Sequence, residues 1–411
     1  MERRVVITGM GIVSPIGKDV QTFWNNLTQG VCGIGPITSF APGDLPIKFV
    51  GEVKDFNAED FGVEKSTARR ADRFTQFALA ASQQAMDNSR LSINPERLGV
   101  YIGSGVGGIH TFFGESKKVL EEGVNRISPL FIPMMISNIA AGNVAIAQKA
   151  EGPCLPVVTA CATGTHSIGE AYRAIKHGYA DAIIAGGTEA SVTPLAIGGF
   201  ANAKALSRAE ELDKASIPFD KRRQGFVLSE GAGIVILEEY EHAKARNAEI
   251  YAEVCGYGNT CDAYHYTAPK PDAACAAKAM TIALKEAGFT DKDELYINAH
   301  GTSTPLNDIT ETHAIKLALG EERARRTLIS STKSMTGHML GAAGGAELIA
   351  SVMTLRTGII HPTIGLLEPD PECDLDYVPL TARRANITIA LSNSLGFGGH
   401  NGSVVIRKIE S

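Results

Sequence analysis

The sequence has few aromatic residues and no long apolar run. Phe, Trp and Tyr make up 6% of its 411 residues, with a single tryptophan. No window approaches the ~18 apolar residues that span a bilayer, so we expect no membrane segment. The opening stretch, MERRVVITGMGIV, has a short β-branched run and no small-residue cleavage site, which favours a strand over a signal peptide.

The cysteines also lack the pattern of a metal site. Seven cysteines lie at positions 32, 154, 161, 255, 261, 275 and 373, an odd number without paired short spacings. This argues against zinc and favours a reducing cytoplasm. The net charge is -6, and basic residues are not interleaved with aromatic ones, which argues against nucleic acid as a partner.

What the sequence does contain is typical of an α/β protein. Apolar residues make up 44% and charged residues 20%, and 411 residues exceed one ordinary hydrophobic core. Apolar runs alternate with segments of 3.6 period, which predicts a sheet covered by helices. The runs form two similar series, which predicts a duplicated unit with halves at residues 1–250 and 251–411. The first series is RVVITG, RLGVYIGSG, LPVVTA, DAIIAGG and GIVILEE, and the second is IYAEVCGYG, ELYINAHG, TLISST, ITIALSN and GSVVIRKI. The first half has extra length at 106–150 and 188–225, which we expect to form the mouth of a site.

Cys161 lies where an apolar run ends and a helical pattern begins. Downstream, Ile168, Ala171, Tyr172 and Ile175 fall at i, i+3, i+4 and i+7. A thiol at a helix N-terminus lies at the positive end of the dipole, which lowers the thiol pKa and predicts a nucleophile. The alternative is a small buried apolar residue. We expect the nearby His166 on the helix surface, and the alternative is that it faces the site.

Two histidines follow strands of the second series. His300, in NAHGTSTPLND, is expected at the carboxyl end of a strand, where open α/β sheets place their sites. His338 lies between a strand and a glycine-rich helix start. The topology predicts both close to Cys161. The alternative is that each is an ordinary hydrogen-bonded core histidine.

Two glycine-rich stretches complete the candidates. Gly103, Gly105 and Gly108 match GxGxxG, but no acidic residue ends a following strand, which argues against a dinucleotide site. NSLGFGGHNGS lies between the last two strands. It is either a hairpin whose glycines supply positive φ, or a turn in which Phe397 presents a backbone N–H to an oxyanion.

Together, TACATG, NAHGTSTPLND, SSTKSMTGHMLGAAG and SNSLGFGGHNGS resemble the β-ketoacyl-acyl carrier protein synthases of bacterial fatty acid synthesis, and among them the elongating synthase II type. The resemblance covers essentially the whole chain. It implies the thiolase fold, with two pseudo-symmetric halves in five α-β-α-β-α layers. It also implies a cytoplasmic homodimeric acyltransferase that uses acyl carrier protein. The expected reaction is the condensation of malonyl carrier with a cysteine-bound acyl group.

The resemblance also implies roles for individual residues. Cys161 corresponds to the acylated nucleophile, and His300 and His338 to the pair that binds the malonyl thioester oxygen. Lys333 corresponds to the lysine that supports the site, and Phe397 to the gate residue whose N–H joins that of Cys161 in an oxyanion hole. No cofactor is implied, because the phosphopantetheine arm enters with the carrier.

Further positions carry over from the family. The threonines that bind the phosphopantetheine arm correspond to Thr302 and Thr304. The acyl pocket corresponds to Val106, Phe131, Ile132, Gly198 and Phe200. The gate loops correspond to Asp262, Gly398 and Gly399. Carrier docking corresponds to Lys65, Arg69 and Arg70, and a monovalent cation in some relatives to Asn298, Glu347, Ser392 and Asn393. Glu347 could instead simply pair with Lys333. The chain departs from the family at Leu395 and His400, where phenylalanine and threonine are common.

Other readings remain open. A polyketide ketosynthase shares every catalytic residue. A chain-length-factor subunit lacks the nucleophile, which Cys161 argues against. A biosynthetic thiolase needs a second cysteine where this chain has GFGGHN. A nicotinamide oxidoreductase would need the dinucleotide site.

Overall fold

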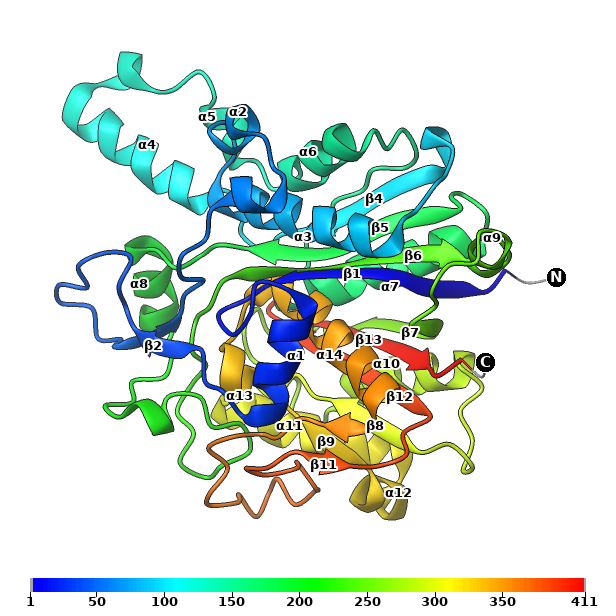
Figure 1. The fold of residues 1–411 in the computed structure, drawn as a ribbon. Coiled ribbons are helices and arrows are strands. Elements are labelled where there is room, and N and C mark those ends of the chain that lie inside the picture. Colours follow the sequence, from blue (N-terminus) through cyan, green and yellow to red (C-terminus); the bar gives the residue numbers. More distant parts are fainter. Residues whose placement is uncertain (1–2, 410–411) are drawn as a thin grey trace.

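A computed structural model describes residues 3–409 of the chain, and nine strands form one hydrogen-bonded sheet (Figure 1). In sheet order the strands are β4 (Leu98–Gly103), β5 (Ala182–Glu189), β6 (Gly231–Glu239), β1 (Val5–Val13), β7 (Ala252–Cys261), β13 (His400–Arg407), β12 (Ile389–Gly396), β8 (Leu295–Asn298) and β9 (Leu328–Ser330). Two small ribbons pair β2 (Ile34–Pro36) with β3 (Phe49–Gly51), and β10 (Ile359–Ile360) with β11 (Arg383–Arg384).

The sheet consists of two sets of strands with the same pairing pattern. From β1 through β6 and β5 to β4, the pairs are antiparallel, antiparallel and parallel. From β7 through β13 and β12 to β8, the pairs are again antiparallel, antiparallel and parallel, and β9 adds a further parallel strand. Where the second set has β9, the first has only a parallel bridge between Cys154 and Val100. The two sets meet where Val5–Ile7 pairs antiparallel with Ala252–Val254. The predicted duplication is confirmed.

Helices lie outside and between the two sets. They are α1 (Val20–Gln29), α2 (Lys65–Ala68), α3 (Arg73–Ser89), α4 (Ile109–Glu122), α5 (Phe131–Met135), α6 (Ile139–Gln148), α7 (Thr163–Lys176), α8 (Pro194–Asn202), α9 (Tyr240–Ala245), α10 (Ala274–Glu286), α11 (Pro305–Leu319), α12 (Glu321–Arg326), α13 (Lys333–Thr336) and α14 (Ala343–Thr357). On the outside, α3 packs against β1, β6 and α6, and α10 against β7, β13 and α11. Between the sets, α7 and α14 contact each other and strands of both sets, which completes the five layers.

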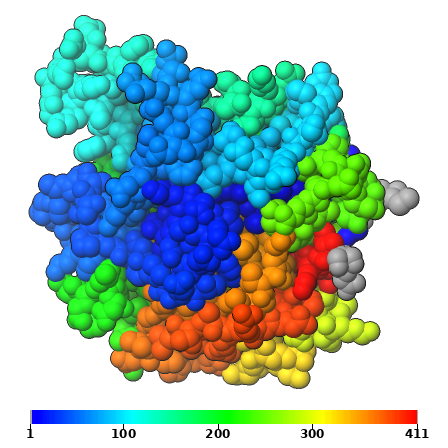
Figure 2. Space-filling view, viewed as in Figure 1, coloured from blue at the N-terminus to red at the C-terminus, as the bar shows by residue number. Residues whose placement is uncertain are grey.

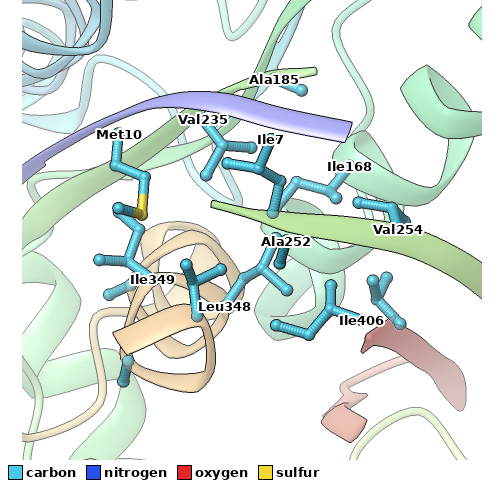
Figure 3. Close-up of a cluster of buried hydrophobic side chains, with 14 of the residues drawn as sticks. Ile7, Met10, Ile168, Ala185, Val235, Ala252, Val254, Leu348, Ile349 and Ile406 are labelled. Atoms are coloured by element: carbon cyan, nitrogen blue, oxygen red, sulfur yellow. The ribbon is translucent and has the colours of Figure 1, made fainter. Parts of the chain in front are cut away.

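The main hydrophobic core is shared by both halves. Ile7 of β1 and Val235 of β6 meet Leu348 of α14 and Ile406 of β13 in the interior (Figure 3). The four apolar positions of the predicted helix after Cys161 are all buried on α7, at Ile168, Ala171, Tyr172 and Ile175. Because burial of apolar surface is the main stabilising term, this core fixes α7 between the strand sets.

The prediction of a strand at LPVVTA was wrong. Only the Cys154 bridge pairs there, through Pro153 O to Val100 N and Leu155 N to Val100 O. Pro156 has no N–H to continue the ladder, and the chain runs on as a loop to the turn at Cys161. The prediction for His166 was also wrong. Its side chain is buried, packed where Gly402 of β13 leaves space, because a Cβ on Gly402 would lie 2.7 Å from His166 Nε2.

The long segment after β4 stands out from the body of the molecule. Figure 1 shows α4 projecting beyond the strands, and in Figure 2 the same cyan segment projects from the body of the molecule. Within residues 3–409, no helix combines the length and apolar character that crossing a membrane requires.

Candidate active site

Cys161 lies in a 3-10 turn, η4 (Ala160–Ala162), that leads directly into α7. Ala160 has a φ of 50°, a left-handed conformation that costs a residue with a Cβ roughly 1–2 kcal/mol. Thr163 Oγ1 accepts the N–H of Thr159 at 2.9 Å and so closes the turn. Gly396 approaches so closely that a Cβ there would lie 2.9 Å from Thr159 O. The turn is therefore clamped by the end of β12.

The protonation of Cys161 differs from the prediction. Burial raises the pKa of its thiol to about 11, although the charge of Lys333 and the backbone N–H of Phe397 act in the opposite direction. The side chain is 8% exposed, and desolvation of a thiolate outweighs the favourable surroundings of a helix start. The thiol is therefore protonated at neutral pH.

His300 and His338 face each other in the site, with ring centroids 5.3 Å apart and planes at 86°. His300 follows β8, and its backbone N–H donates to Glu311 Oε1 at 2.7 Å. The His338 ring packs edge-on against Phe226 at 5.1 Å. Both ring nitrogens of His338 are buried, and neither has a hydrogen-bond partner among residues 3–409. Its N–H group is thus available to a substrate.

Both imidazoles are neutral. Burial and the charge of Lys333 hold the pKa of His300 and that of His338 well below the ordinary value. Lys333 Nζ donates to His300 O at 2.7 Å and lies 3.3 Å from His300 Nδ1. Because an ammonium only donates, Nδ1 accepts and the His300 proton is on Nε2.

Lys333 is itself buried and forms an ion pair with Glu347. Both side chains are 1% exposed, so each charge depends on the other. The alternative interpretation, in which Glu347 pairs with Lys333, is confirmed by this ion pair.

One cavity of about 340 Å³ joins these groups. Its lining includes the predicted site residues Cys161, His300, His338, Phe397, Thr302, Thr304, Asp262 and Gly399. Ala203, Lys204 and Gln224 also line it, so the extra segment 188–225 contributes to the mouth as expected. The segment 106–150 contributes none of the lining residues.

Phe397 lies at the β12–β13 hairpin, where its backbone N–H, together with that of Cys161, acts to lower the pKa of the Cys161 thiol. The turn requires glycine, since φ is 86° at Gly398 and 77° at Gly399. Gly398 N–H donates to Tyr266 O at 2.8 Å, and Asp262 N–H donates to Gly399 O at 2.9 Å. The two predicted gate loops are thus in direct contact.

The predicted acyl-pocket residues are not brought into this cavity. Phe131 and Ile132 lie on α5, where Ile132 is 54% exposed, and Val106 is 41% exposed. Gly198 of α8 has open space where a Cβ would point. Only Phe200 approaches the site, with its ring 6.3 Å from that of Phe397. Within one chain these residues form surface and not a pocket wall.

The predicted docking residues Lys65, Arg69 and Arg70 are exposed on α2 and the turn after it. The neighbouring Arg73 differs, because it forms an ion pair with Glu230 at 2.7 Å and stacks on an aromatic ring.

The residues predicted near a monovalent cation fit such an ion. Asn298 Oδ1, Ser392 Oγ and Glu347 Oε2 are buried and lack a hydrogen-bond partner within residues 3–409. Asn298 and Ser392 are register partners on β8 and β12. Asn393 Oδ1 is already used, since it accepts from Ser403 Oγ at 2.8 Å. Unpaired oxygen acceptors of this kind are the ligands that hard cations prefer.

The sequence analysis missed two supporting residues, Glu311 and Phe226. Glu311 accepts the N–H groups of His300 and Gly301 and so fixes the loop that carries the histidine. The signal was an acidic residue on a buried helix face just after the NAHG motif. Phe226, which packs against His338, gave no local signal.

Comparison with known proteins shows to which class of protein this chain belongs. A family model for the N-terminal domain of beta-ketoacyl synthase matches residues 2–243, and one for the C-terminal domain matches residues 251–367. The chain is 50% identical to a 3-oxoacyl-[acyl-carrier-protein] synthase 2 of Staphylococcus aureus and 52% identical to that of a Synechocystis species. In both cases 100% of this chain and 99% of the relative are covered.

Solved structures agree. A type II polyketide ketosynthase, in complex with its acyl-carrier protein, superimposes with a TM-score of 0.91 at 36% identity, covering 100% of both chains. A beta-ketoacyl synthase from Burkholderia phymatum also gives a TM-score of 0.91, at 33% identity and the same coverage. The fold is that of a thiolase-fold condensing enzyme. The chain belongs to the beta-ketoacyl synthase family, and the fold and family predicted from the sequence are confirmed.

Proposed function

We propose that the chain acts as a 3-oxoacyl-[acyl-carrier-protein] synthase of the elongating type. It condenses malonyl carrier protein with an acyl group held on Cys161 and releases CO₂, free carrier and a β-ketoacyl carrier. The observation that carries the proposal is the convergence of Cys161 with two neutral histidines in one cavity.

The first step is transfer of the acyl group to Cys161. The thiol attacks the acyl thioester, and the phosphopantetheine thiol that leaves takes up the proton that Cys161 loses. Exchange of one thioester for another is nearly isoenergetic, so the acyl group stays reactive. The charge of Lys333 and the N–H of Phe397 favour the thiolate that forms during attack.

The second step is decarboxylation of the malonyl thioester. Loss of CO₂ places negative charge on the thioester oxygen, and N–H donors from His300 and His338 stabilise that enolate. Neutral imidazoles are suited to this task, because each keeps a ring N–H and adds no charge that would bind the malonyl carboxylate in the ground state.

The third step joins the two substrates. The carbanion attacks the acyl carbonyl on Cys161, and the resulting oxyanion is bound by the N–H groups of Cys161 and Phe397. Collapse of this intermediate breaks the C–S bond to Cys161 and gives a chain longer by two carbons, and the departing thiolate takes up a proton from solvent to restore the thiol. Thr302 and Thr304, whose hydroxyls lie 2.9 Å apart in the cavity lining, bind the phosphopantetheine arm.

The second candidate function is condensation in a polyketide pathway, which the structural neighbours favour. The ketosynthase with the bound carrier shares 36% identity with this chain, against 50% and 52% for the two 3-oxoacyl-[acyl-carrier-protein] synthases. The higher identities support the fatty acid role. The presence of Cys161 argues against a non-catalytic chain-length factor.

We also propose a cytoplasmic homodimer. Six large apolar side chains are exposed on the surface around α4 and α5, whereas single scattered apolar residues are normal on a protein surface. They are Phe112, Phe113, Leu120, Val124, Leu130 and Ile132. A second copy packed on this surface would also close a pocket over Val106 and Ile132. Sedimentation equilibrium is expected to give twice the chain mass, and the Ile132→Glu variant is expected to give a mass closer to that of the monomer.

All seven cysteines are free, which supports a reducing compartment such as the cytoplasm.

The experiment that tests the function is mass spectrometry of carrier-bound products. Malonyl carrier is mixed with acyl carriers of graded length and the protein, with Cys161→Ala as the matched control. A β-ketoacyl carrier two carbons longer, absent with the variant, is the expected result. Malonyl loss without elongation would identify a partner-type subunit, and an unchanged mixture would overturn the proposal.

A further inference from the structure

Glu189 is a buried carboxylate that the condensation mechanism does not use. It ends β5 with 0% of its surface exposed, and no Lys, Arg or His of residues 3–409 lies within ion-pair distance. Its oxygens instead accept four hydrogen bonds. Oε1 accepts Ser104 Oγ at 2.7 Å and Val106 N at 3.3 Å, and Oε2 accepts Gly105 N at 2.9 Å and Gly341 N at 3.1 Å. Burying a carboxylate with only neutral hydrogen-bond donors costs folding free energy, so we expect this carboxylate to serve a role.

The four donors come from two segments far apart in the sequence. Three belong to residues 104–106, directly after β4. The fourth, Gly341, lies in the 3-10 turn η6 (Leu340–Ala342) that leads into α14. Glu189 therefore joins the end of a first-half strand to the start of a second-half helix.

The η6 turn is the counterpart of the turn that carries Cys161. Both are three-residue 3-10 turns directly before a long central helix. Both begin with a left-handed residue, with φ 50° at Ala160 and 45° at Leu340. Gly341 thus occupies the position of Cys161 in the second half. Its N–H donates to the Glu189 carboxylate, whereas the Cys161 N–H is the proposed donor to a substrate oxyanion.

The Glu189 cluster also reaches the nucleophile turn. A Cβ on Gly105 would lie 2.8 Å from Glu189 Oε2 and 3.3 Å from Ala160 O, so the loop held by Glu189 packs on the residue before Cys161. A negative charge on Glu189 raises the pKa of the Cys161 thiol, while burial raises the pKa of Glu189 and its four hydrogen bonds act in the opposite direction.

We propose that Glu189 is a positioning residue for Cys161. Its carboxylate fills the second half's counterpart of the oxyanion site, fixes residues 104–106 and Gly341 against the Ala160 turn, and holds a negative charge beside the thiol. The proposal rests on the proposed role of Cys161 as the nucleophile.

The test is Glu189→Gln, which keeps the side-chain volume, removes the charge and replaces one acceptor oxygen by an amide donor. At constant folded fraction, kcat for condensation should fall at least tenfold, while KM for acyl carrier stays within about twofold of the wild-type value. The pH midpoint for alkylation of Cys161 by iodoacetamide, followed on the Cys161 peptide by mass spectrometry, should move to lower pH, because a nearby negative charge is gone.

Glu238→Gln is the matched control. Glu238 is also 0% exposed, but it lies on β6 with Thr8, His242 and Arg246 as partners. This control should lose stability and leave kcat and the alkylation midpoint unchanged. If Glu189→Gln behaves in the same way, Glu189 is only structural and the proposal is overturned.

Two further results keep the outcomes distinct. If Glu189→Gln does not fold, Glu189→Asp, which retains the charge on a shorter stem, should reduce kcat and keep the wild-type alkylation midpoint; unchanged kcat would overturn the proposal. If the wild-type protein fails to condense at all, the proposed function fails, whereas the alkylation midpoints still report whether the Glu189 charge acts on Cys161.

Discussion

At the scale of single residues, burial sets the protonation of the site. It keeps the Cys161 thiol protonated and the His300 and His338 rings neutral, because each charged form would lose its hydration. Lys333 and Glu347 form a buried ion pair beside them. The site therefore holds one buried ion pair behind three uncharged reacting groups.

The thiol can be tested by its alkylation. With a pKa of about 11, the rate constant for iodoacetamide at Cys161 should rise about tenfold for each pH unit between pH 7 and 10, because only the thiolate reacts. The measurement is peptide-resolved mass spectrometry, since Cys32, Cys154 and Cys261 are exposed and serve as internal references. A plateau at Cys161 above pH 8 would show instead that the helix start lowers the thiol pKa.

The histidines can be tested by separating the half-reactions. His300→Ala should still be acylated at Cys161 but decarboxylate malonyl carrier about 10²–10³-fold more slowly, as expected for loss of one oxyanion donor. His338→Ala should behave alike. Because the pKa of each histidine lies well below the ordinary value, both rings stay neutral as the pH falls from 8 to 6, and wild-type decarboxylation should stay level. A rate change centred near pH 6.5 would contradict that assignment.

At the scale of elements, the site depends on the close crossing of α7 and α14. A Cβ on Gly164 would lie 2.9 Å from Gly341 O, and one on Gly344 would lie 2.5 Å from Thr165 N. Only glycine permits this approach, and it brings the turns at Cys161 and Gly341 together between the strand sets.

Gly344→Ala should therefore push the two central helices apart. We expect the free energy of unfolding to fall by about 1–3 kcal/mol, as for overpacking of a core, and kcat to fall with it. The control is Gly114→Ala on the projecting α4, where a Cβ meets nothing within 4 Å. That variant should gain about 0.5–1 kcal/mol, because alanine favours the helix. Urea denaturation measures both, and equal effects would refute the close-crossing argument.

At the scale of the whole molecule, α2 and the turn after it carry exposed basic residues on the outside of the fold (Figure 1). The chain carries a net charge of -6, so Lys65, Arg69 and Arg70 form a local exception suited to an acidic carrier. Exposed charges act mainly on association and are screened by salt.

Arg69→Glu combined with Arg70→Glu should raise KM for acyl carrier on the order of tenfold at low salt, with kcat nearly unchanged. The difference from wild type should shrink as salt is added. Arg384→Glu is the matched control, because Arg384 is exposed on β11, far from α2 (Figure 1). Equal KM values for the double variant and the wild type would place docking elsewhere.

Local patterns predicted much of the fold and the site. The 3.6-residue spacing after Cys161 predicted α7, and the matching strand runs predicted the duplicated sheet, because both depend on short-range periodicity. The strand predicted at LPVVTA did not form, since a strand needs a neighbouring strand with unpaired backbone N–H and C=O groups, which the local pattern does not report. His166 was misplaced because only the contact with Gly402 decides its burial.

The sequence alone determined which chemical groups this protein has and in what order, because motifs such as TACATG and NAHGTSTPLND are local and specific. Tertiary structure decided what those groups do. The Cys161 thiol is protonated, not activated, because burial outweighs the helix start, and no periodicity reports burial. Glu189 became a candidate only when folding placed it between Gly105 and Gly341, since contacts between distant segments depend on packing, which the chain acquires only as a folded whole.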